Sequence, residues 1–156
     1  MYKNIMVPLD GSPLAECVLP HLDALAKGCQ MENVTLVRVV EDVRMPGGAE
    51  AGFDEKQLKE IYTSRKAEAE QYLSQLAKRI KYDNVKVKST LLAGSVADSL
   101  ADYATKNDID LILISTHGRS GVSRWIWGSV ADRILRSACV PVFMVRAPGC
   151  VPGVTD

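Results

Sequence analysis

The segment with the clearest fold signal is LILISTHGRSGVSRWIWGSVADRILR, residues 111–136. It begins with an unbroken apolar run at 111–114, passes through a glycine-rich stretch and ends in a helical pattern at 130–136. This order predicts a buried strand that leads through a loop into an amphipathic helix. A strand followed by a helix is the repeating unit of an α/β fold.

The same alternation extends along the whole chain. Apolar runs predict five strands, at 4–9, 34–40, 85–92, 111–115 and 142–145. Helical patterns between them predict four helices, at 13–27, 54–80, 95–106 and 129–137. Because most strand runs are apolar without alternation, both faces of the sheet should be buried. We therefore predict an α/β fold: a single doubly wound, five-stranded parallel sheet sandwiched by helices, Rossmann-like in its topology.

Two of the predicted helices have recognisable start signals. Ser12 followed by Pro13 predicts an N-cap with proline at the first helical position. Ser95 with Asp98 three residues later resembles a capping box in which aspartate replaces glutamate.

The composition favours one domain without a dominant charge. The 156 residues are enough for one well-buried core and few for two. We expect residues 1–147 to form that domain and residues 148–156 to form a C-terminal tail. Lysine and arginine together number 19, as do aspartate and glutamate, so no net charge favours nucleic acid or an anionic membrane surface as a partner.

The apolar runs are too short for a membrane protein. No segment approaches the roughly 18 apolar residues of a transmembrane helix, and the first run is too short for a signal peptide. The four cysteines lie far apart, which suits a reducing compartment. Cys17 and His21 could share a metal, although a buried thiol beside a boundary histidine is the commoner arrangement. We expect a cytoplasmic protein without a membrane partner.

The glycine-rich stretch is a candidate phosphate site. Gly118, Gly121 and Gly128 would let main-chain N–H groups converge on an anion, and Ser129 adds a hydroxyl at the start of the next helix. The N-terminus of that helix contributes partial positive charge. The alternative is a connecting loop that needs several turns. Neither a Walker A motif nor the Gly-x-Gly-x-x-Gly fingerprint is present in the sequence.

Asp10 should lie beside this stretch. In an open parallel sheet, ligands bind outside the carboxyl ends of the strands where the strand order reverses, and the strands at 4–9 and 111–115 should be neighbours there. The Asp10 carboxylate could accept hydrogen bonds from ribose hydroxyls or help to hold a phosphate-bound Mg²⁺. A turn residue in Asp10-Gly11-Ser12-Pro13 is an equally weighted alternative.

Two polar side chains of the glycine-rich stretch are further candidates. His117 could contact a phosphate or act as a base, although a lone histidine in a loop more often hydrogen-bonds the loop backbone. Arg119 could reach a phosphate, or it could extend into solvent.

The motifs resemble those of the universal stress protein family over almost the full chain. The matching pieces are IMVPLDGS at 5–12, TLVRVV at 35–40, Gly-Ser at 94–95, and the block at 115–129 that is followed by VPV at 140–142. In the ATP-binding branch of that family the pattern is Gly, two residues, Gly, nine residues, then Gly-Ser or Gly-Thr. Gly118, Gly128 and Ser129 fit this pattern, and Ser115 stands in place of the first glycine. Serine is small enough that we expect the site to survive.

The resemblance implies that this Rossmann-like fold is of the adenine-nucleotide-binding type, with an ATP site and Mg²⁺. Asp10 would contact the adenosine end, and the backbone of Val39 would recognise adenine. The phosphates would lie against residues 118–119 and 128–130, and the backbone at 8–9 would line the same pocket. The full set of expected binding residues is Pro8, Leu9, Asp10, Val39, Ser115, His117, Gly118, Arg119, Gly121, Gly128, Ser129 and Val130.

The resemblance also implies a homodimer that pairs through its last strand. Val142, Phe143, Met144 and Val145 would form an exposed apolar edge that a second copy can extend. Pro141 at the start of that strand costs no bond of a central ladder.

These inferences predict an ATP-binding, stress-response regulatory protein that acts as a homodimeric nucleotide sensor. Hydrolysis should be slow or absent, because the sequence has no Walker lysine and no obvious carboxylate fixed beside the γ-phosphate. One alternative is a dimeric interaction module of the same family that binds no nucleotide, which the nearly complete glycine pattern disfavours. Another is an enzyme that adenylates or hydrolyses a substrate, which the lack of a second domain disfavours.

Overall fold

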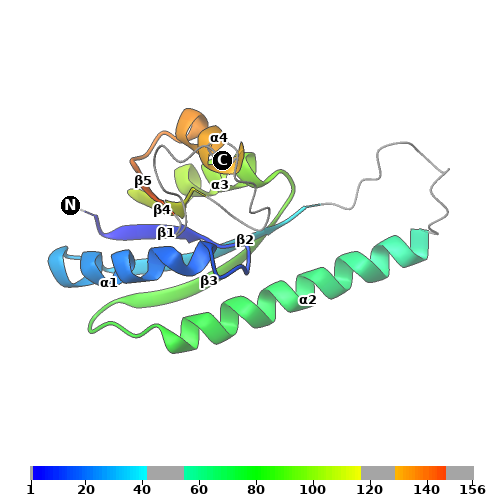
Figure 1. The fold of residues 1–156 in the computed structure, drawn as a ribbon, viewed down its shortest axis with the longest axis horizontal. Helices are drawn as coiled ribbons and strands as arrows, with labels where there is room; N and C mark the ends of the chain where they lie inside the picture. The colour runs from blue at the N-terminus through cyan, green and yellow to red at the C-terminus, as the bar shows by residue number, and fades with distance from the viewer. Residues whose placement is uncertain (1, 42–54, 117–128, 147–156) are drawn as a thin grey trace, which may run out of the picture.

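The computed structural model describes residues 2–41, 55–116 and 129–146, which form an α/β structure (Figure 1). The strands in these residues are β1 (Asn4–Pro8), β2 (Asn33–Val40), β3 (Lys86–Ala93), β4 (Leu111–Ser115) and β5 (Val142–Val145). The helices in the same residues are the 3-10 helix η1 (Ala15–Val18), α1 (Leu19–Gly28), α2 (Glu55–Arg79), α3 (Val96–Lys106) and α4 (Ser129–Ser137). The expected C-terminal tail, 148–156, lies outside the described residues.

The five strands form one sheet in the order β3-β2-β1-β4-β5. Each neighbouring pair is parallel. β1 lies at the centre, and the chain moves outward from it first through β2 and β3 and then through β4 and β5. The predicted α/β architecture is therefore confirmed, and so is the prediction that the first and fourth strands are neighbours where the order reverses.

Different helices bury the two faces of the sheet. Ile5 of β1 belongs to a buried cluster that includes Leu22 of α1 and Leu73 of α2. Met6, the next residue, packs in a second cluster with Ile134 of α4. Figure 1 shows α2 on one side of the sheet and α3 and α4 on the other. Because successive residues of a strand point to opposite faces, an unbroken apolar strand such as β1 can supply both cores.

The first predicted helix begins differently from the expectation. Ser12 Oγ accepts a hydrogen bond from the backbone N–H of Ala15 at 3.1 Å, so serine does stabilise the start. The chain then forms η1, however, and the α-helix begins only at Leu19. Pro20 explains the shift, because it has no N–H to donate to the carbonyl four residues earlier and its ring crowds that carbonyl.

The capping box predicted for α3 is wrong. Ser95 is the N-cap residue, but its side chain makes no capping hydrogen bond. Asp98 pairs instead with Arg133 of α4, with 3.2 Å between the carboxylate and guanidinium. Aspartate is one methylene shorter than the glutamate of a capping box, and here the cation on the neighbouring helix engages it.

Hydrogen bonds from polar side chains link the amino ends of the central strands. The Asp110 carboxylate accepts hydrogen bonds from the backbone N–H groups of Lys3 at 2.9 Å and Asn4 at 3.2 Å. The Asn33 side-chain amide donates to the Asn4 side-chain oxygen at 2.7 Å. These contacts join β1, β2 and the start of β4 at the edge opposite to the predicted site.

None of the described helices is both long enough and apolar enough to cross a lipid bilayer.

Candidate functional site

The carboxyl ends of β1 and β4 part from each other. The ladder between them covers two residue pairs and ends at Met6 and Ile112. The ladder between β1 and β2 continues to Pro8 and Val37. Pro8 has no N–H, so it cannot donate to a neighbouring strand. We call this edge between β1 and β4 the switch point, because the strand order reverses here, and α/β sheets bind ligands at such positions.

A tight turn follows β1 at the switch point. Asp10 Oδ1 accepts a hydrogen bond from the backbone N–H of Ser12 at 2.8 Å. Gly11 between them has a φ of +83°, a backbone conformation that residues with a Cβ rarely adopt. The structure therefore confirms the turn role for Asp10. A contact with ribose or Mg²⁺ stays a prediction, and the two roles are compatible because a carboxylate can accept several hydrogen bonds.

The first predicted ligand residues lie on three adjacent strands. Pro8 and Leu9 are buried at the end of β1, and Ser115 is buried at the end of β4. Val39 is half-buried near the end of β2. Parallel strands share one carboxyl edge, so these positions come together with Asp10 at the switch point.

The remaining predicted ligand residues belong to the loop and the helix after β4. Ser129 is the first residue of α4, and Val130 is half-buried in its first turn. A helix that connects parallel strands runs antiparallel to them, so the N-terminus of α4 lies at the carboxyl edge. The other predicted residues, His117, Gly118, Arg119, Gly121 and Gly128, lie outside the described residues.

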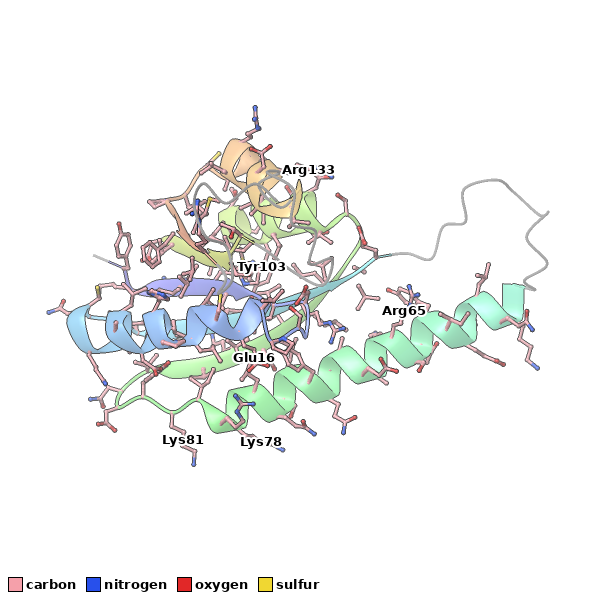
Figure 2. The ribbon with its side chains drawn as sticks, viewed as in Figure 1. Glu16, Arg65, Lys78, Lys81, Tyr103 and Arg133 are labelled. Atoms are coloured by element: carbon pink, nitrogen blue, oxygen red, sulfur yellow. The ribbon has the colours of Figure 1, made fainter. Side chains whose placement is uncertain are left out.

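A polar cluster beneath the Asp10 turn was not predicted. The guanidinium of Arg38 in β2 lies 5.6 Å from the ring centroid of Tyr72 in α2. The Tyr72 hydroxyl donates to the Glu16 carboxylate at 3.0 Å, and Arg79 approaches the other oxygen of that carboxylate at 3.3 Å. Figure 2 shows Glu16, which precedes α1, on the side that faces α2. One signal was available in the sequence: Arg38 interrupts the apolar run at 34–40.

The environment of Tyr72 favours its neutral form. Burial raises the pKa of its hydroxyl most, and the negative charges of Glu16 and Asp10 raise it further. The Arg38 guanidinium acts on the same pKa in the opposite direction. A tyrosine that keeps its proton remains a hydrogen-bond donor to Glu16, so the link between α2 and η1 is maintained.

The family of this chain follows from its match to a family model. The model describes the universal stress protein family and matches residues 1–146. The chain belongs to this family. It is 30% identical over 150 residues to Universal stress protein MJ0531 of Methanocaldococcus jannaschii, and the alignment covers 95% of this chain and 84% of that relative.

Solved structures of universal stress proteins share the fold. The chain matches protein MJ0577 of Methanocaldococcus jannaschii with a TM-score of 0.82 and 25% identity, over 96% of this chain and 99% of the other. It matches universal stress protein UspA from Lactobacillus plantarum with a TM-score of 0.80 and 25% identity, over 93% and 98% of the two chains. The five-stranded parallel sheet is thus the fold of the family.

Two other solved universal stress proteins contain a nucleotide. One is in complex with cAMP and matches with a TM-score of 0.67 and 19% identity, over 94% of this chain and 98% of the other. The other, from Arabidopsis thaliana, has AMP bound and matches with a TM-score of 0.64 and 14% identity, over 94% and 93% of the two chains. For this chain, likeness at these identities establishes the fold.

Proposed function

We propose that this universal stress protein binds an adenine nucleotide at the switch point, and that the nucleotide is ATP with Mg²⁺. The observation that carries the proposal is the meeting of the Asp10 turn with the ends of β1 and β4 where the strand order reverses. Solved relatives with the same fold contain cAMP or AMP, which share an adenosine monophosphate group. The proposed role is that of a regulatory protein that senses nucleotide in the stress response.

The residues at the switch point fit the parts of such a ligand. Half-buried Val39 and its backbone suit the adenine ring, and the Asp10 carboxylate suits ribose hydroxyls or Mg²⁺. The first N–H groups of an α-helix have no partner within the helix, so the N-terminus of α4 and its helix dipole would favour an anion. The glycine pattern at 118 and 128 would supply further main-chain donors to the phosphates.

Binding rather than turnover is the proposed activity. The sequence has no Walker lysine to place on the phosphates, so little or no hydrolysis is expected. The cytoplasm is the proposed location, because Cys17, Cys29 and Cys139 are free thiols and would stay reduced there.

Titration with ATP and Mg²⁺ tests the proposal. Isothermal calorimetry is expected to show saturable binding with a Kd below about 1 mM. Asp10→Asn should weaken binding about tenfold, because it removes the charge that ribose or Mg²⁺ would meet while its side-chain oxygen can still accept the Ser12 N–H. Asp98→Asn, at an exposed carboxylate on α3, is the matched control and should bind like the wild type. Absence of saturation at millimolar ATP would contradict the proposal.

We further propose that two copies pair through β5. This strand is at the edge of the sheet, so one side of its backbone has no neighbour within the described sheet. Phe143 is 43% exposed on it, and its ring meets His21 of α1 edge-on with 5.9 Å between the centroids. An apolar edge of this kind suits an isologous dimer, in which each copy offers the same strand.

Phe143→Asp is expected to convert the dimer to a monomer. The substitution places a charge on the proposed interface, where desolvating it is unfavourable. Light scattering coupled to size exclusion at micromolar concentration measures the mass directly. Leu135→Asp on α4, where leucine is 49% exposed, is the control and should remain dimeric. A monomeric wild type, or equal dissociation of both variants, would reject this interface. A dimer without nucleotide binding would support the interaction-module alternative.

A further inference from the structure

Arg38 holds a defined place beneath the switch point. It is half-buried in β2 between the apolar residues Val37 and Val39. Its guanidinium stands over the Tyr72 ring at 5.6 Å, within the range of a cation–π interaction. Tyr72 is held in turn by its 3.0 Å hydrogen bond to Glu16. A planar cation over an oriented ring has few alternative positions, so the guanidinium charge stays at one position in the structure.

The guanidinium lies beside the turn that follows β1. A Cβ added to Gly11 would lie 3.0 Å from Arg38 Nη1, 3.3 Å from Cζ and 3.6 Å from Nη2. The turn therefore passes close to the guanidinium at Gly11. Glycine suits this position, because it has no Cβ to crowd the guanidinium and it tolerates the φ of +83°.

The charges of Asp10 and Arg38 act on one common group. The Asp10 carboxylate raises the pKa of Tyr72 and the Arg38 guanidinium lowers it. Both charges are thus close enough to influence the same hydroxyl. Because Gly11 follows Asp10 directly, the guanidinium that lies close to Gly11 also lies close to the Asp10 residue.

We propose that Arg38 is a positioning residue that holds the Asp10 turn, and with it the Asp10 carboxylate, in the orientation that recognises the ribose hydroxyls of the nucleotide. The inference rests on the proposed function, and Arg38 itself need not touch the ligand. Its contribution should therefore depend on the ribose hydroxyls, whereas a purely structural role would affect all nucleotides alike.

The test compares ATP with 2′,3′-dideoxy-ATP by calorimetry. The wild type is expected to prefer ATP by at least about tenfold, because the half-buried Asp10 carboxylate would lose the hydroxyl donors of the ribose. Arg38→Met, which keeps most of the side-chain volume, should bind ATP about tenfold more weakly and dideoxy-ATP within about twofold of the wild type. Arg38→Lys keeps the charge without the planar group and should lose about threefold for ATP alone. Arg79→Met removes a cation that contacts Glu16 at the exposed side of the cluster and should preserve the preference.

The outcomes separate this inference from the proposed function. A wild type that binds neither nucleotide would overturn both. A wild type that binds both equally, or Arg38 variants that keep the full preference for ATP, would overturn the positioning role and leave nucleotide binding intact. Equal losses for the two nucleotides in both Arg38 variants would also overturn it, because they indicate a general structural effect. Thermal unfolding of each variant shows whether it is folded, and Arg38→Lys decides the question if Arg38→Met is not.

Discussion

Ile134→Ala is expected to lower the free energy of unfolding by about 2–5 kcal/mol. Ile134 is 0% exposed on α4, within the cluster that joins this helix to the sheet. Alanine would remove buried methyl groups and leave a cavity that the sheet beneath cannot fill without moving. Urea denaturation followed by circular dichroism measures the change.

The next residue along the helix provides the control. Leu135 is 49% exposed, so Leu135→Ala should change the free energy of unfolding by no more than about 0.5 kcal/mol. Similar losses in both variants would mean that α4 is not anchored through Ile134. Because α4 starts at the switch point, that result would also argue against the proposed phosphate site.

Gly11→Ala is expected to destabilise the protein by about 1–3 kcal/mol and to weaken ATP binding. The φ of +83° costs a residue with a Cβ about 1–2 kcal/mol. The added Cβ would also lie 3.0 Å from Arg38 Nη1, which has to shift although the Tyr72 ring supports it. Urea denaturation measures the first effect and calorimetry with ATP measures the second.

Gly28→Ala is the matched control. A Cβ at Gly28 would meet nothing within 4 Å, and this glycine is the last residue of α1. Alanine there should be neutral or should stabilise the protein by up to about 1 kcal/mol, because it lowers the entropy of the unfolded chain and favours helix. If both glycine variants change stability in the same direction and by the same amount, the close approach of Arg38 to the turn has no energetic consequence.

The pattern of apolar residues was sufficient to predict the strands. The predicted strand at 4–9 and β1 differ by one residue, and those at 111–115 and 142–145 agree with β4 and β5. Burial on both faces leaves a continuous apolar run, and such a run is a local property that can be read without knowing the fold. The start of the first helix was harder to predict, because Pro20 delays the α-helix to Leu19. The start of α3 was predicted to within one residue, but its capping contact was not, because Arg133 from another helix pairs with Asp98.

The candidate site was partly predictable for a related reason. Asp10 lies two residues after the end of β1, and Ser115 is the last residue of β4. Parallel strands present their carboxyl ends at one edge of the sheet. Their meeting at the switch point therefore follows from topology. The glycine positions 118, 121 and 128 and the side chains of His117 and Arg119 lie outside the described residues, and their contact with phosphate stays a prediction.

By itself, the order of residues along the chain determined the class of the sheet, that β1 and β4 are neighbours in it, and that an acidic turn follows β1. Only the tertiary structure decided what supports that turn. Arg38 and Tyr72 are far apart in sequence, and they meet because α2 packs against β2 on one face of the sheet. No local pattern specifies such a contact, since it depends on which helix covers which face and on where along the strand the helix crosses.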